Sequence, residues 1–198
     1  PLRNAPQIFS DLRRVFPPTA GRHVVGPMVQ LRWGTPTLLT LDLALLVELP
    51  SPVRVVVLGR LQVLLPSQAH PLVQIRMDAL GVLDVSAETV SLDATLYDSK
   101  ILQFPLTGDM ALRAGWGRQP QFVLAIGGFH PRFAPPPGLP ALQRLALQLA
   151  DGDSLQLRCQ AYLAVTSNTV QFGARVDLHA AGGGFSFDGM LGFDAILQ

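Results

Sequence analysis

The sequence alternates strictly between apolar and polar residues over stretches much longer than an ordinary strand. From residue 39 to residue 49 every odd-numbered position is Leu or Val, whereas Thr40, Asp42 and Glu48 occupy even-numbered positions. Because successive side chains of a strand point to opposite faces, this pattern predicts a strand with one apolar face. Strands of about ten to fourteen residues would span roughly 33 to 46 Å at ~3.3 Å per residue, against a usual ~17 to 20 Å.

The same period of two recurs along most of the chain. It is seen at residues 53–65, 73–77, 90–96, 102–112, 122–126, 155–165, 170–178 and 185–197. Residues 142–149 fit either a short helix or the alternation, and a strand is the favoured interpretation. The turn formers of residues 167–169 and 182–184 predict hairpins between the last three strands.

Together these strands predict an all-β fold, namely a long antiparallel meander curled into a groove, an open barrel or a sandwich. Residues 6–16 instead place apolar side chains at helical spacing before Pro17, which predicts a short N-terminal helix. We therefore expect an N-terminal helix and linker over residues 1–20 and an extended antiparallel β domain over residues 21–198. Within that domain, the proline-rich residues 130–140 predict a connection outside the strands. Both ends of the sequence suggest a segment of a longer chain.

The low charge of the chain distinguishes it from an ordinary soluble domain. Charged residues make up 15% and hydrophobic residues 48% of the sequence, and the mean hydropathy is +0.33; charged residues usually make up about 25%. A formal net charge of +1 provides no basic field for a phosphate backbone, which argues against nucleic-acid binding. No apolar run reaches the roughly eighteen residues of a membrane-spanning helix.

One short string is typical of an enzyme. Residues 151–155, Asp-Gly-Asp-Ser-Leu, match the serine motif of one esterase family, in which a helix follows the serine. Here an alternating segment follows, so a hairpin turn is the better interpretation. The four histidines lack metal-ligand spacing, and the single Cys159 lies on the apolar side of its strand. We predict no enzyme activity, no metal site and no cofactor.

Acidic residues also recur near the C-terminus. Asp177, Asp188 and Asp194 fall on the polar side of neighbouring segments, together with Arg175. Their spacing matches no calcium-binding loop. A solvated polar face with cross-strand ion pairs is therefore favoured over a metal site.

The candidate functional surface is the apolar side of the alternating segments. A continuous apolar face of this width must be covered by a second sheet, by curling of the same sheet, by lipid or by a partner protein. The residues expected on it, as ligand contacts or as core, are Leu41, Leu43, Leu45, Val55, Val57, Leu61, Leu157, Leu163, Phe172, Val176, Phe187, Leu191 and Phe193.

Two stretches carry a resemblance to a known family: AYLAVTSNTVQFGAR at residues 161–175 and GMLGFDA at residues 189–195. They resemble a large bacterial family of long β-rich proteins, described as a domain of unknown function, and the likeness is strongest over residues 161–198. The resemblance implies long β structure and a longer parent, and it supplies no catalytic residue. In architecture, the succession of amphipathic strands also resembles the β-groove of bridge-like lipid-transfer proteins.

Two functions are compatible with these features. One is a non-catalytic module whose extended apolar face binds lipid or another apolar ligand. The alternative is a structural or interaction module that packs into a larger multi-repeat or multi-subunit assembly. An outer-membrane barrel would require aromatic girdles at both ends of its strands, and two Trp and two Tyr are too few to form them.

Overall fold

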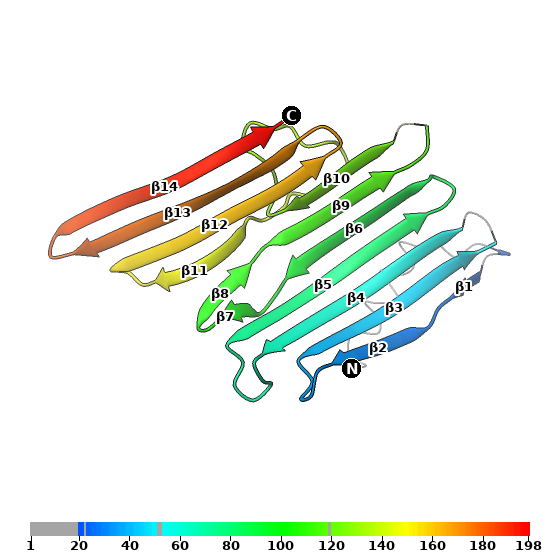
Figure 1. Ribbon diagram of the computed structural model, residues 1–198, viewed down its shortest axis with the longest axis horizontal. Helices are drawn as coiled ribbons and strands as arrows, with labels where there is room; N and C mark the ends of the chain where they lie inside the picture. Colours follow the sequence, from blue (N-terminus) through cyan, green and yellow to red (C-terminus); the bar gives the residue numbers. More distant parts are fainter. Residues whose placement is uncertain (1–19, 22, 51–52, 119) are drawn as a thin grey trace.

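The computed structural model describes residues 20–21, 23–50, 53–118 and 120–198. Within these ranges the chain forms one antiparallel sheet of 14 strands and no helix (Figure 1). The predicted helix at residues 6–16 lies outside the described residues. The strands are β1 (His23–Val25), β2 (Met28–Trp33), β3 (Leu39–Leu49), β4 (Arg54–Leu65), β5 (Val73–Asp84), β6 (Thr89–Leu96), β7 (Ser99–Ile101), β8 (Phe104–Thr107), β9 (Asp109–Gly115), β10 (Gln121–Ile126), β11 (Leu145–Asp151), β12 (Leu155–Thr166), β13 (Val170–Gly182) and β14 (Phe185–Leu197).

The fourteen strands make ten ribbons, because four ribbons each consist of two strands lying end to end. Both β1 and β2 pair with β3, both β6 and β7 pair with β5, and both β10 and β11 pair with β12. Likewise, β9 lies between β6 and β10, whereas β8 lies between β7 and β11. The order across the sheet is therefore β1/β2, β3, β4, β5, β6/β7, β9/β8, β10/β11, β12, β13 and β14.

The central ribbons are divided where the backbone leaves the extended conformation. Asp98, between β6 and β7, has a φ of 43°, and Gly108, between β8 and β9, has a φ of 154°. The pairings around these breaks close into a ring that starts and ends at β5, but β2 and β14 do not pair with each other. The described residues are all-β and antiparallel, as predicted. The expected barrel and sandwich are wrong for the described residues, which form one open layer.

The pairing register separates an apolar face from a polar face. The apolar face carries the odd-numbered residues of β2 to β5, β12 and β14 and the even-numbered residues of β6, β9, β10 and β13. The remaining residues of these strands form the polar face. Residues that are paired across neighbouring strands place their side chains on the same face. The apolar residues of every ribbon therefore lie on one side of the sheet.

The buried core lies on the polar face, which is the opposite of what the alternation suggests. Residues 127–144 leave the sheet after β10 and return to it at β11, crossing the polar face on the way (Figure 1). Beneath them, Val123, Ala125 and Ala164 are buried together with Phe129. Phe129 also stacks on Phe133 with ring centroids 5.5 Å apart. The apolar face therefore does not supply the core, because the covering segment packs on the other side.

Elsewhere the polar face carries ion pairs. Four Arg–Asp pairs lie on it, Arg54–Asp84 (3.2 Å), Arg60–Asp78 (2.8 Å), Arg113–Asp93 (2.8 Å) and Arg175–Asp177 (2.7 Å), as does His179–Asp188 (2.6 Å). The N–H of Ala87 and the guanidinium of Arg54 both donate to Asp84 and lower the pKa of its carboxyl. The charges on this face are thus largely balanced locally, as on a surface in contact with water.

Candidate functional site: the apolar face

All thirteen residues expected on the candidate surface lie on the apolar face. Pairs such as Leu41 opposite Leu61 and Leu163 opposite Phe172 show that the register aligns them across strands. Six of the thirteen lie on β3 and β4 and seven on β12 to β14. The central ribbons separate the two groups, so the thirteen residues do not form one compact cluster.

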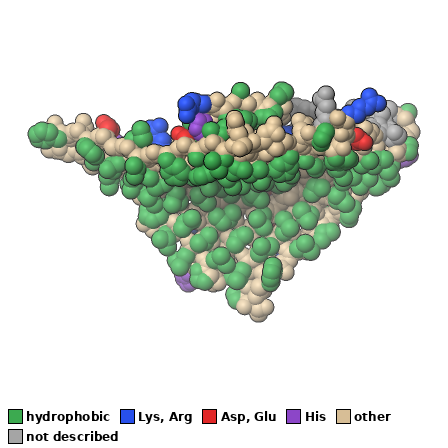
Figure 2. All heavy atoms as spheres, turned by 45° about the horizontal axis from the view of Figure 1, so that its top comes forward, with side chains coloured by type: hydrophobic (Ala, Val, Ile, Leu, Met, Phe, Trp, Pro, Cys, Tyr) green, Lys and Arg blue, Asp and Glu red, His purple; other side chains and the backbone are tan. Residues whose placement is uncertain are grey.

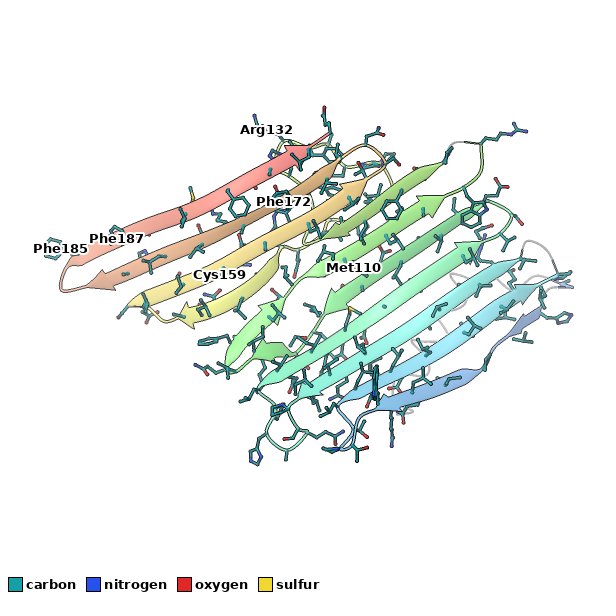
Figure 3. The ribbon with its side chains drawn as sticks, viewed as in Figure 1. Met110, Arg132, Cys159, Phe172, Phe185 and Phe187 are labelled. Carbon is teal, nitrogen blue, oxygen red and sulfur yellow. The ribbon has the colours of Figure 1, made fainter. Side chains whose placement is uncertain are left out.

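The central ribbons join the two groups with apolar residues that the thirteen omit. Met77 pairs with Leu96, Leu112 pairs with both Leu92 and Leu124, and Leu124 pairs with Val165 on β12. Of the side chains labelled in Figure 3, Met110 on β9 belongs to this continuation, whereas Cys159 and Phe172 lie on β12 and β13. The alternation in the sequence already marks these residues; what it does not show is that their strands are adjacent.

Polar side chains are almost absent from the apolar face of the described strands. His23 lies at its β1 edge, opposite Leu49. Ser99 is buried, with 5% of its surface exposed, and its hydroxyl accepts a hydrogen bond from the N–H of Arg76 at 2.8 Å. Cys159, half-buried between Leu147 and Val176, adds a thiol that behaves as a small hydrophobe. A contacting molecule would therefore meet hydrocarbon over nearly the whole face.

No described part of the chain covers the apolar face. None of the thirteen residues is buried: seven are half-buried, and the other six are exposed, from 36% at Leu45 to 76% at Leu191. Figure 2 shows hydrophobic side chains spread broadly over this face, with charged side chains gathered along its upper margin. Each apolar side chain is shielded only by its neighbours on adjacent strands, as in the edge-to-face contact of Phe172 and Phe193 at 6.2 Å. Covering such a face stabilises a protein by ~25 cal/mol per Å² of apolar surface.

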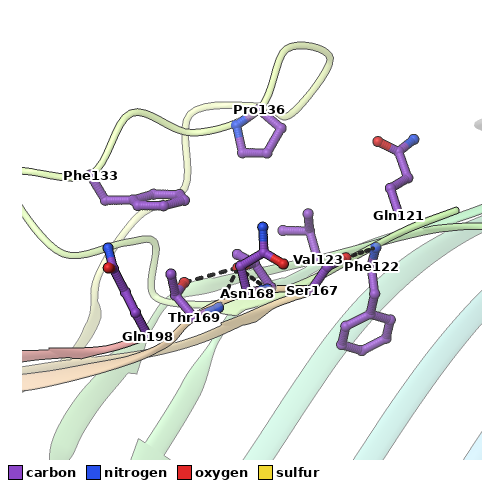
Figure 4. Close-up of a pocket in the computed structure, with 10 residues that line it drawn as sticks. Gln121, Phe122, Val123, Phe133, Pro136, Ser167, Asn168, Thr169 and Gln198 are labelled. Carbon is purple, nitrogen blue, oxygen red and sulfur yellow. Dashed lines mark hydrogen bonds between the residues drawn. The ribbon is translucent and has the colours of Figure 1, made fainter. Parts of the chain in front are cut away.

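A second candidate is a cavity of about 490 Å³ on the polar face, between residues 127–144 and the sheet. Phe133 and Pro136 form its roof and Val123 part of its floor (Figure 4). Its remaining lining consists of Gln121, Phe122, Thr166, Ser167, Asn168, Thr169 and Gln198. None of these side chains is an ordinary acid, base or metal ligand, so the cavity has no groups for acid–base chemistry.

A third candidate is the polar cluster around Tyr162, on the same face. The phenol of Tyr162 donates to Asp194 at 2.9 Å, and burial together with this bond raises its pKa to about 12. Arg144 lies over the ring at 4.1 Å and donates to the carbonyls of Gly127 and Phe129. A phenol with a raised pKa stays protonated near neutral pH and can keep donating to Asp194. The contacts of Arg144 fasten residues 127–144 to the sheet.

The esterase-like string at residues 151–155 is a hairpin turn. The N–H of Gly152 donates to the carbonyl of Leu155 at 2.9 Å, and the N–H of Leu155 donates back at 3.3 Å. Strand β12 follows Ser154, where the esterase motif requires a helix. Among the described residues, no three His, Cys, Asp or Glu side chains gather in a way that could hold a metal ion. The described residues also include no helix that could cross a membrane.

Comparison with known proteins places the whole chain in one family. A family model described as "Family of unknown function (DUF6603)" matches residues 1–198. No curated protein and no solved structure matches the chain. Since the family model covers its full length, this chain belongs to the DUF6603 family.

Proposed function

We propose that this chain is a non-catalytic β module whose apolar face binds the hydrocarbon chains of lipids or a similarly apolar ligand. One observation carries the proposal: apolar side chains continue across every ribbon from β2 to β14, and the described strands add only His23 and Ser99 as polar side chains on that face. Proteins that leave such a face exposed usually bind something there.

The chemistry of the face favours hydrocarbon over a polar partner. Protein interfaces carry about one hydrogen bond per 100–200 Å² and a polar rim. The apolar face offers no array of side chains that could form such bonds, whereas hydrocarbon needs none. Ten ribbons about 4.8 Å apart, with strands rising about 3.3 Å per residue, give a face roughly 40 Å in each direction. An area of that size accommodates several acyl chains side by side.

The two faces also differ in how their side chains are satisfied. On the polar face, acidic and basic groups pair with one another, and Arg60 gains a raised pKa from its hydrogen bond and its charge interaction with Asp78. Among the described strands, the apolar face has no equivalent pairs. Water therefore suits the first face and an apolar ligand suits the second.

Lipid extraction followed by mass spectrometry tests the proposal directly. The purified chain should carry lipid, and Leu191→Asp should reduce the load, because a carboxylate on the apolar face must lose its hydration. Met190→Asp is the matched control: Met190 neighbours Leu191 on β14, is 65% exposed and lies on the polar face. Val176→Asp, nearer the middle of the face, should reduce the load further.

Equal lipid loads in Leu191→Asp and Met190→Asp would overturn the proposal, provided that circular dichroism shows both chains folded. Recovery of the unmodified chain as a folded monomer free of lipid would overturn it as well.

The second candidate function is a structural or interaction module in which the same face packs against other repeats or subunits. The observation that favours it is the free edge of β14, a 13-residue strand that pairs only with β13 among the described residues. Unpaired edges are templates for further strands. Multimers of defined size that hold no lipid, measured by sedimentation, would favour this function over lipid binding.

A further inference from the structure

The two edges of the sheet differ: one is the continuous strand β14, and the other is the divided ribbon β1/β2. At one end, β14 is continuous over 13 residues and contains neither Pro nor Lys, the residues that commonly protect an edge. At the other end, Pro27 separates β1 from β2, and both strands pair only with β3 among the described residues. The β14 edge therefore lacks this protection, and the β1/β2 edge has it only at the break around Pro27.

The most exposed large apolar side chains of the described chain all lie on these two edges. They are Met28 (84%), Phe185 (84%), Trp33 (78%), Leu191 (76%), Met190 (65%) and Phe187 (61%). Figure 3 shows Phe185 and Phe187 at the far end of β14, beyond the body of the sheet. Exposure is thus greatest where a further strand could be added.

Backbone hydrogen bonds show which residues of each edge are free to pair. The N–H of Leu45 donates to the carbonyl of Pro27. The backbone N–H and C=O groups of the odd-numbered residues of β2 therefore point toward β3, and those of its even-numbered residues point outward. The N–H of Ala181 donates to Ser154 across β12 and β13, so odd-numbered residues of β13 face β12. The backbone groups of the even-numbered residues of β13 point toward β14, where they pair with odd-numbered residues. The outward residues of β14 are therefore also even-numbered.

These outward residues place their side chains on the polar face at both edges. Strand direction alternates across ten ribbons, so β2 and β14 run in opposite directions. A second copy laid beside the first in the same orientation therefore presents its β2 antiparallel to β14. The apolar faces of the two copies then lie on the same side and become continuous.

We propose that the β14 edge of one copy of this chain pairs with the β1/β2 edge of a second copy, head to tail. Charge fixes the register, with Arg32 opposite Asp188: Arg32 is exposed and forms no ion pair within the described chain, and the Asp188 side chain is 77% exposed although it also binds His179. Both residues are even-numbered, so both face outward. The same register sets Trp33 opposite Phe187 and Val29 opposite Leu191, which are favourable cross-strand pairs on the apolar face.

A twofold pairing of β14 with itself fits less well. With full overlap about its centre at Leu191, Asp188 would lie opposite Asp194 of the other copy, and like charges directly opposite are destabilising. Head-to-tail pairing avoids this conflict. It is also open-ended, because each added copy leaves one edge of each kind free.

Sedimentation velocity on the purified chain, as a function of concentration and at low salt, tests the arrangement. The unmodified chain should form a series of species that grows with concentration. Arg32→Asp alone and Asp188→Arg alone should each weaken association about tenfold, since each replaces an attraction by a repulsion. An equimolar mixture of the two variants restores an opposite-charge pair at every junction and should recover association.

Two further results decide the matter without depending on charge. Met190→Pro removes an N–H that faces away from β13 and should stop growth while the chain stays folded. A chain that remains monomeric, forms only a twofold dimer, or associates equally well in all variants would overturn the proposal. Lipid load is measured on the same samples and should not change with the charge swaps, so failure here is separate from failure of lipid binding.

Discussion

The hydroxyl of Tyr162 on β12 donates to Asp194 on β14 at 2.9 Å, across the intervening strand β13. The residue beneath this bond is Gly173, which pairs with both Tyr162 and Asp194. A Cβ at that position would lie 2.5 Å from Cε1 of Tyr162 and 2.6 Å from Oδ1 of Asp194. The missing side chain of Gly173 therefore makes room for a bond that ties the edge strand to the interior of the sheet.

Gly173→Ala should destabilise the chain by about 1–3 kcal/mol, because the new methyl group displaces Tyr162 and meets the carbonyl of Phe193 at 2.8 Å. Urea unfolding followed by circular dichroism measures the loss. Gly182→Ala is the control, since a Cβ there meets nothing within 4 Å, and it should be neutral or slightly stabilising. Equal stability of both variants would contradict this account of Gly173.

The stability of the chain should fall in alkali because of Tyr162. Burial, and then the hydrogen bond to Asp194, raise the pKa of Tyr162 to about 12 from its ordinary value of 10. A group whose pKa is higher in the folded state stabilises below the unfolded value and loses this contribution as the pH rises from about 10 to about 12. The difference in phenolate absorbance between the unmodified chain and Tyr162→Phe should show this late titration. A titration of Tyr162 centred near pH 10 would contradict it.

Arg144 should control how tightly residues 127–144 are held against the sheet. Its guanidinium donates to Gly127 at 3.0 Å and to Phe129 at 2.7 Å while lying over the ring of Tyr162. Lys cannot reproduce this planar, two-pronged arrangement. Arg144→Lys should therefore speed amide hydrogen exchange in residues 127–144 by several-fold, whereas Arg132→Lys, at an exposed position of the same segment, should not. Equal exchange in the two variants would contradict this role.

Gln171 should be among the least replaceable residues of the polar face. Its side chain has no exposed surface; it accepts from the N–H of His130 at 3.0 Å and donates to Thr169 at 2.8 Å. Gln171→Ala leaves a buried N–H without its partner and opens a cavity, so we expect a loss of about 2–4 kcal/mol in the free energy of unfolding. Gln156→Ala, at an exposed position of β12, should change stability by less than about 0.5 kcal/mol.

The alternation in the sequence was enough to predict on which face of the sheet each side chain of a strand lies. Side-chain direction depends only on position along a strand, so residues as far apart as Leu41 and Phe193 could be assigned to one face without knowledge of the pairing. Residues 145–149, where helix and strand were both open, form part of β11 because the neighbouring strands β8 and β12 pair with them.

The covering of each face could not be predicted in the same way. Nothing local to Ala164 shows that residues 127–144 will fold over it, because its contact with Phe129 joins positions far apart in the chain. The breaks in the central ribbons leave fainter signals, such as Gly108 and the turn-prone Asp98. Periodicity reports which side a residue faces, and only tertiary contacts determine which side becomes the core.

The single-layer construction of the sheet has a consequence for how such sequences can diverge. Without an opposing layer, no side chain of the apolar face has to fit a complementary shape, so exchanges among Leu, Ile, Val and Met cost little. Ala125 and Ala164, with no exposed surface beneath residues 127–144, have no space for an added methyl group. Relatives should therefore vary freely in the identity of their apolar-face residues while keeping these two small residues.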